Sequence, residues 1–198
     1  MIFKEGHIYH IYNQGNNKGR IFFIRENYLF FLRKIKQHIL PYADILAWCL
    51  MPNHFHLMVY VKSSSESECD FKSRPDLRPD YSTLNKSIGI MLASYTRAIN
   101  IQENRSGSLF RSETKAICLN EISGIAPSWF KTSGITYFNI GLPEKEYPLV
   151  CFNYIHQNPV NAGFVNSPEE WEFSSYADCV GLRDDKLINK TRIKEFGL

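Results

Sequence analysis

The segment Met51-Pro-Asn-His-Phe-His-Leu-Met-Val-Tyr-Val61 constrains the fold more than any other stretch of the chain. Residues 57–61 are apolar and β-prone, which predicts a strand over 54–61 that is entered through Pro52. Side chains two apart on a strand point to the same face. His54 and His56 therefore share one face, and Phe55 anchors the opposite face in a core. Two imidazoles on a rigid strand form half of a site for a divalent metal ion.

Apolar periodicity predicts further elements on both sides of this strand. We expect strands over 7–13, 44–50 and 115–119, a short extended piece over 21–24, helices over 26–39 and 83–100, and largely helical segments over 122–138 and 148–156. Ser82 or Thr83 is the expected cap of the second helix. The short link 51–53 predicts a hairpin. The polar stretch 62–80 cannot build a core and predicts a mobile loop.

The resulting β-α-β-β-α-β order is that of the ferredoxin-like arrangement, an α+β fold with an antiparallel sheet and helices on one face. We expect this domain over residues 1–120. Residues 121–198 are expected to form a C-terminal helical extension that packs on it as part of a single structural unit.

Composition excludes several classes of protein. The apolar fraction of 44% indicates a folded globular chain of 198 residues, and no apolar run approaches the roughly 20 residues that span a bilayer. The five cysteines have no Cys-x-x-Cys spacing, which favours reduced thiols in a cytoplasmic protein over disulfides or a thiolate zinc site. A net charge of +3 permits nucleic-acid binding without requiring it.

Three kinds of side chain are candidates for chemistry, and each has a plainer alternative. The histidine pair suits a catalytic Mg²⁺ or Mn²⁺, but such pairs also occur as buried, hydrogen-bonded histidines or as surface residues. Tyr95, in the middle of the second helix, is a candidate nucleophile or a core aromatic. Asn100 lies about 140° around that helix from Tyr95, and it is either a third metal ligand or a helix-terminating residue.

Five blocks of the chain, in this order, resemble the single-tyrosine HUH transposases of the IS200 type, and within them the branch associated with repetitive extragenic palindromes. The resemblance extends from about His7 to Arg183. The blocks are Met51-Pro-Asn-His-Phe-His-Leu-Met-Val59, Ser94-Tyr-Thr-Arg-Ala-Ile-Asn100, Asn104-Arg-Ser-Gly-Ser-Leu-Phe110, Tyr154-Ile-His-Gln-Asn-Pro-Val-Asn-Ala-Gly-Phe-Val165 and Trp171-Glu-Phe-Ser-Ser-Tyr176.

This resemblance implies a ferredoxin-like catalytic domain that cleaves and rejoins single-stranded DNA near hairpins. It assigns a divalent metal, Mg²⁺ or Mn²⁺, to His54 and His56. It matches Tyr95 to the nucleophile that forms a 5′-phosphotyrosine, and from its place on the same helix we infer that Asn100 is the third ligand. The block that begins at Tyr154 is expected to serve packing. Related proteins include both monomers and dimers that exchange the tyrosine helix.

Single-stranded DNA that contains a hairpin is thus the expected partner, and no membrane is expected. Phosphate contacts are predicted for basic residues, and Tyr12 and Phe110 are candidate stacking surfaces, although each of these residues also fits an ordinary surface or core role. The basic residues are Lys18, Arg20, Arg97, Arg105, Arg111 and Lys115.

Two other functions compete with this one. A domesticated relative would hold DNA or RNA hairpins without cutting them. A small hydrolase would use the same metal on another substrate, but no Asp or Glu stands near the histidine pair as an obvious general base.

Overall fold

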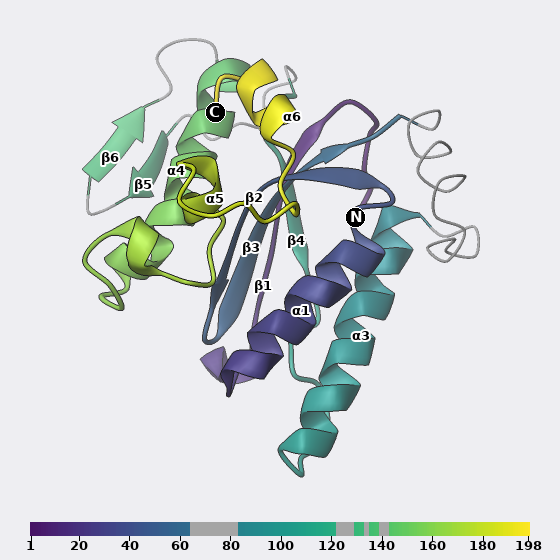
Figure 1. Ribbon diagram of the computed structural model, residues 1–198. Coiled ribbons are helices and arrows are strands. Elements are labelled where there is room, and N and C mark those ends of the chain that lie inside the picture. Colours follow the sequence, from purple (N-terminus) through teal and green to yellow (C-terminus); the bar gives the residue numbers. More distant parts are fainter. Residues whose placement is uncertain (64–82, 122–128, 133–134, 139–142) are drawn as a thin grey trace.

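A computed structural model of the chain describes residues 1–63, 83–121, 129–132, 135–138 and 143–198 (Figure 1). The predicted β-α-β-β-α-β order is confirmed. Its elements are β1 (Ile8–Gln14), α1 (Arg25–His38), β2 (Ala43–Met51), β3 (His54–Val61), α3 (Leu84–Gln102) and β4 (Lys115–Cys118). The four strands form one antiparallel sheet in the order β2-β3-β1-β4. The fold is therefore the expected ferredoxin-like α+β sheet.

One face of the sheet is covered by α1 and α3, which pack against each other (Figure 1). Phe31 and Ile35 of α1 are fully buried there, and so are Met91 and Tyr95 of α3. Phe55 of β3 points into the same layer, with its ring centroid 5.1 Å from that of Phe31. Burying each such side chain contributes about 1.5–3 kcal/mol, so this layer is the main core.

Side-chain caps fix where the two helices begin. The Oδ1 atom of Asn27 accepts hydrogen bonds from the backbone N–H groups of Phe23 and Ile24, at 3.0 and 3.2 Å. Thr83 caps α3 as predicted, because its hydroxyl accepts from the backbone N–H of Lys86.

The opposite face of the sheet is covered by α4 (Pro143–Asn161), which packs on β2 and β3. The predicted arrangement with helices on one face of the sheet therefore holds for α1 and α3. The C-terminal helix α4 adds a layer on the other face. The remaining helical elements are η1 (Asn16–Lys18), η3 (Pro168–Glu170), α5 (Tyr176–Cys179) and α6 (Lys190–Glu195). No helix among the described residues is long and apolar enough to cross a membrane. The domain boundary at residue 120 stays a prediction.

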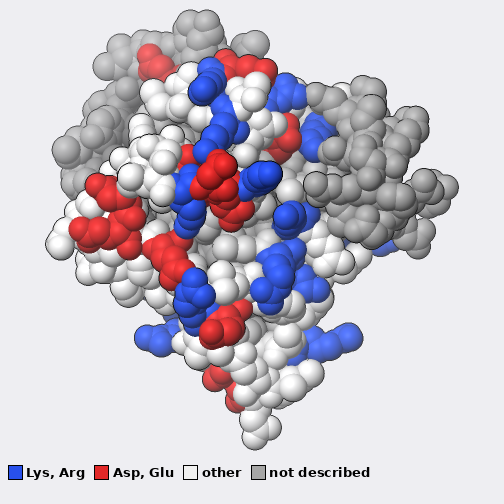
Figure 2. Space-filling model, viewed as in Figure 1, with Lys and Arg blue, Asp and Glu red and all other residues white. Residues whose placement is uncertain are grey.

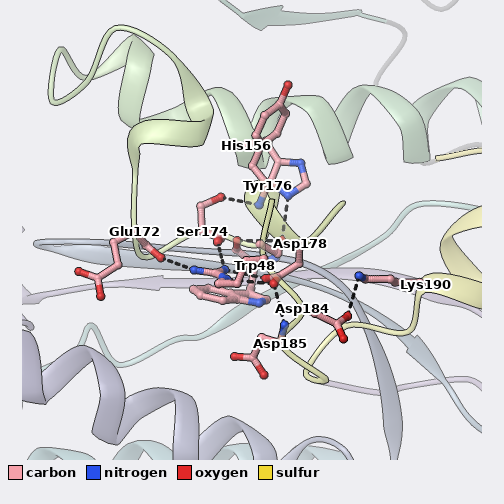
Figure 3. A network of polar contacts seen from close by, with 11 residues as sticks. Trp48, His156, Glu172, Ser174, Tyr176, Asp178, Asp184, Asp185 and Lys190 are labelled. Carbon is pink, nitrogen blue, oxygen red and sulfur yellow. Dashed lines mark hydrogen bonds and ion pairs between the residues drawn. The ribbon is translucent and has the colours of Figure 1, made fainter. Parts of the chain in front are cut away.

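The outer edge of β2 is covered by the C-terminal segment. Backbone hydrogen bonds join Leu50 to Phe173 and Trp48 to Ser175, and Asn189 donates to Ile45. An exposed sheet edge invites pairing with other chains, and this segment removes that edge. It also holds α4, because the imidazole of His156 is hydrogen-bonded to the Ser175 hydroxyl at 2.8 Å (Figure 3).

One sequence prediction differs from the structure. Within 122–138, which was expected to be largely helical, the described residues form the antiparallel strands β5 (Trp129–Thr132) and β6 (Ile135–Phe138). Both are rich in aromatic and β-branched residues and flank Ser133-Gly134, which favours a hairpin. Residues 21–24 form no strand, because the N–H groups of Ile21 and Phe22 donate to Pro52 outside the sheet. The predicted loop over 62–80 lies almost wholly outside the described residues.

Asp178 organises the C-terminal segment and yields a stability prediction (Figure 3). Its buried carboxylate accepts hydrogen bonds from the Arg183 guanidinium at 2.6 and 2.9 Å and from the Asp185 backbone at 2.9 Å. We expect Asp178→Ala to lower the free energy of unfolding by about 2–3 kcal/mol, measured by chemical denaturation, because these donors lose a charged partner. Asp184→Ala is the matched control, since its pairing with Lys190 is exposed; an equal loss in both variants would contradict the proposed role of Asp178.

Candidate active site

The histidine pair lies at the start of β3, on the face that α4 covers. His56 is opposite Tyr12 of β1 and Cys49 of β2, so it occupies the centre of the sheet. His56 is buried and His54 is half-buried, and their ring centroids are 5.0 Å apart. The strand alternation predicted from the sequence therefore brings both imidazoles to one place.

The C-terminal helix α4 brings a tyrosine and an asparagine to this pair. The Tyr154 ring centroid is 5.4 Å from that of His56. The Asn158 Oδ1 atom is 3.3 Å from His54 Nε2, and Asn158 Nδ2 is 3.3 Å from the Tyr154 carbonyl oxygen that accepts from it. Residues four apart share a helix face, so Tyr154 and Asn158 point together at the histidines.

His54, His56 and Tyr154 line a pocket of about 370 Å³, and Asn158 lies against His54 beside it. Its rim contains Arg111, Glu113 and Lys115, and Tyr12 lines it from β1. The cations on the rim could contact a phosphate. Lys115 is paired with Glu113 at 2.5 Å, which leaves Arg111 as the cation of this rim that has no acidic partner among the described residues.

Burial favours the neutral form of both histidines. Burial lowers the pKa of His54, and burial together with the neighbouring His10 and His54 holds the pKa of His56 well below its ordinary value. A neutral imidazole has one nitrogen lone pair free to bind a metal ion, whereas an imidazolium has none.

Two ring nitrogens that face no hydrogen-bond donor suggest where a cation would fit. The Nδ1 atom of His54 lies 2.6 Å from Asn53 Oδ1, so the proton is on Nδ1 and Nε2 carries a lone pair. That lone pair faces Asn158 Oδ1, which is also an acceptor. The buried Nε2 atom of His56 has no hydrogen-bond partner. Two imidazole nitrogens and one amide oxygen are a donor set that suits a divalent cation such as Mn²⁺.

The described residues include no group of three or more His, Cys, Asp and Glu side chains that could hold a metal ion. A site at this pair would therefore need the Asn158 amide, substrate oxygens or water to complete its shell.

Tyr95 does not join this site. Its ring lies on the other face of the sheet, fully buried, with its centroid 4.9 Å from that of Phe31. Its hydroxyl donates to the backbone oxygen of Ile21 at 2.8 Å, and burial raises its pKa above the ordinary value of tyrosine. The predicted convergence of Tyr95 with His54 and His56 is wrong for this structure, because the sheet separates them.

Asn100 is also remote from the histidines. Its Nδ2 atom donates to Gly107 O at 2.8 Å, and its buried Oδ1 atom has no partner among the described residues. It lines a groove of about 910 Å³ beside α3 that also includes three of the predicted DNA-binding arginines, namely Arg97, Arg105 and Arg111. The amide that faces His54 is that of Asn158, and the expected third ligand, Asn100, lies away from the histidine pair.

The other predicted basic residues lie near the same end of the sheet. The Lys18 carbonyl accepts from Asn53, the residue before His54, at 3.2 Å. Lys18 and Arg20 are exposed, and neither lines the histidine pocket. On the face seen in Figure 2, Lys and Arg are interspersed with Asp and Glu and form no continuous basic field.

The sequence contained a signal for the residues that were missed. Tyr154 lies in the segment predicted to be helical, and Asn158 lies two residues beyond its predicted end and one helical turn from Tyr154. Tyr95 and Asn100 are five positions apart and point in different directions. A third missed residue is His10 on β1, whose side chain is hydrogen-bonded to that of His56. The sequence does not show that β1 lies beside β3, so the contact between His10 and His56 could not be predicted before the order of the strands in the sheet was known.

Comparison with known proteins agrees with the fold. No protein-family model matches the chain, and no curated protein matches it. One solved structure, described as a REP-associated tyrosine transposase bound to a REP hairpin, is similar over 96% of this chain and 94% of that chain, with 14% sequence identity and a TM-score of 0.54. At this identity the likeness shows a shared fold, that of a REP-associated tyrosine transposase.

The burial of Tyr95 leads to a prediction about stability. We expect Tyr95→Phe to lower the free energy of unfolding by about 1 kcal/mol in chemical denaturation, because the Ile21 carbonyl loses its donor. Tyr154→Phe is the matched control and should leave stability unchanged, since the Tyr154 hydroxyl has no hydrogen-bond partner in the part of the chain that the structure describes. The reverse order of effects would contradict the structural role given to Tyr95.

Proposed function

We propose that this protein is a single-tyrosine HUH transposase of the IS200 type that cleaves and rejoins single-stranded DNA near hairpins. One observation carries the proposal: Tyr154 lines the same pocket as His54 and His56, and Asn158 contacts His54, although both α4 residues are about a hundred residues away from the histidine pair in the sequence. The shared fold with a REP-associated tyrosine transposase that was solved with a REP hairpin supports it.

Tyr154 is the nucleophile in this proposal. Its hydroxyl oxygen attacks the phosphorus of a phosphodiester, and the bond from phosphorus to the 3′ oxygen breaks. The phenol loses its proton, the departing 3′ oxygen gains one, and the 5′ phosphate remains on the tyrosine. Because the phosphotyrosine keeps the energy of the broken linkage, a 3′-hydroxyl can reverse the step and rejoin the strand without ATP.

The residues that would hold Mg²⁺ or Mn²⁺ are His54 and His56 through their Nε2 atoms and Asn158 through its amide oxygen. When bound, such an ion would polarise the scissile phosphate and take up charge that develops on its oxygens. Asn158 also links the two halves of the site, because its Nδ2 atom is hydrogen-bonded to the backbone of Tyr154.

The α3 groove is the proposed path of the DNA strand that leaves the site. Asn13 and Arg111 line both this groove and the histidine pocket, so the two are continuous around the end of β1. Buried Asn13 fixes the loop over residues 111–114, because its Nδ2 atom donates to Arg111 O at 3.2 Å and to Thr114 Oγ1 at 2.9 Å. Arg97 and Arg105 extend the basic lining beyond the pocket.

All four groups of the proposed site come from one chain. Tyr154 already lies against His56 of the same protomer, so a monomer contains a complete site and no exchange of helices between subunits is required.

The nucleophile assignment is tested by trapping the covalent adduct. Wild-type protein is incubated with Mn²⁺ and single-stranded hairpins copied from the DNA that flanks its gene, and the adduct is detected by mass. We expect Tyr154→Phe to reduce adduct formation by about a thousandfold or more while hairpin binding persists, because the attacking oxygen is lost.

Tyr12→Phe and Tyr95→Phe are the controls, because Tyr12 lines the same pocket and Tyr95 lies in the core. Both should still form the adduct. An adduct in Tyr154→Phe would refute the assignment, and loss in Tyr12→Phe alone would transfer the role to Tyr12. Hairpin binding without any adduct in the wild type would favour the non-cleaving binder.

The groove leads to a prediction about salt. We expect the double variant Arg97→Gln/Arg111→Gln to bind the same hairpins more weakly and to reduce the slope of log affinity against log salt by roughly 0.7 for each lost single-strand phosphate contact. Lys194→Gln, an exposed cation on α6, is the control and should change neither. An unchanged slope in the double variant would exclude the groove as the DNA path. The affinity for the hairpins is measured by fluorescence anisotropy in the presence of a metal chelator.

A further inference from the structure

We propose that His10 is a positioning residue, which keeps the proton of His56 on Nδ1 so that His56 Nε2 presents a lone pair to the metal ion. This inference rests on the proposed function, because it concerns the same site. No prediction from the sequence gave His10 a role.

The geometry places His10 directly behind His56. His10 is on β1, in register with Met58, and its Nε2 atom is 2.8 Å from His56 Nδ1. The two rings lie nearly parallel, at an angle of 26° with centroids 5.0 Å apart. Both side chains are buried, with exposed fractions of 7% for His10 and 5% for His56, so bulk water does not compete for this hydrogen bond.

Only one proton can lie between these two nitrogens. If His10 Nε2 carried it, neutral His56 would keep its own proton on Nε2 and could not bind a metal ion there. If His56 Nδ1 carries it, His10 Nε2 is the acceptor and His56 Nε2 is free. The His10 ring is buried, where a charged imidazolium without an acidic partner would be costly, so a neutral ring that accepts through Nε2 fits this position. In the second arrangement the unpartnered Nε2 atom of His56 is open to a ligand.

The other histidine of the pair has a corresponding support. Asn53 Oδ1, which can only accept, holds the His54 proton on Nδ1 at 2.6 Å. Each of the two histidines thus has a hydrogen-bond acceptor on the side of its ring that points away from the pocket. For His54 that acceptor is an amide oxygen from the neighbouring residue, and for His56 it is an imidazole from the next strand.

The test measures Mn²⁺ affinity without DNA, by the loss of the free-ion electron paramagnetic resonance signal. His10→Phe keeps a ring of similar shape but has no acceptor, and we expect it to weaken Mn²⁺ binding 10- to 100-fold. His10→Gln can place an amide oxygen near the former Nε2 position and should restore affinity to within a few-fold of the wild type. His56→Ala gives the affinity of a site that lacks this ligand.

A folded His10→Phe variant that binds Mn²⁺ like the wild type would overturn the proposal, and so would equal losses in His10→Phe and His10→Gln. A second measurement needs no substitution at His10. Long-range ¹H–¹⁵N correlation spectra of the wild type, assigned with His56→Ala, should show His56 protonated on Nδ1 and not on Nε2. The opposite tautomer would overturn the proposal even if His10→Phe fails to fold.

These outcomes are separable from those of the proposed function. Wild-type protein that binds no Mn²⁺ and forms no adduct would refute the metal-dependent cleavage, whereas the spectra would still decide which nitrogen of His56 carries the proton. If the wild-type protein cleaves DNA but its spectra show His56 protonated on Nε2, His10 has no part in the mechanism and the proposed function is unaffected.

Discussion

The alternation of side chains along β3 is the constraint on which the rest of the structure depends. Phe55 points into the layer formed by α1 and α3, and His54 and His56 point to the layer formed by α4. A shift of one residue in register would exchange the two sets. The apolar core therefore fixes the position of the polar site: the burial that places Phe55 against Phe31 also determines where the two imidazoles face.

The second element of the site depends on the C-terminal segment. Tyr154 and Asn158 can reach the histidines only if α4 lies flat on the sheet, and His156, between them on the same helix, is tied to Ser175. Ser175 is in turn bonded to the backbone of Trp48 in β2. The segment that closes the sheet edge thus also sets the position of the helix that carries the proposed nucleophile.

Local patterns predicted much of this fold, and the exceptions have a physical cause. The strand at 54–61 and its paired histidines followed from a period of two, and both core helices followed from their apolar stripes. Tyr95 lies in such a stripe, with Met91 and Ile99, and that position by itself indicated the core. What local pattern could not show is which face of the sheet each helix covers, because this depends on contacts between distant segments. Asn158 and His54, for example, are 104 residues apart.

The two faces of the sheet meet at the end of β1, where Asn13 and Arg111 belong to both the histidine pocket and the α3 groove. On the pocket side, an imidazole lone pair faces an amide oxygen, and His56 Nε2 has no partner. Acceptors that lack a donor cost free energy when they are buried. A bound cation would remove that cost. If the proposed metal ion binds here, an anionic strand that enters from the arginine-lined groove would meet its positive charge beside Tyr154.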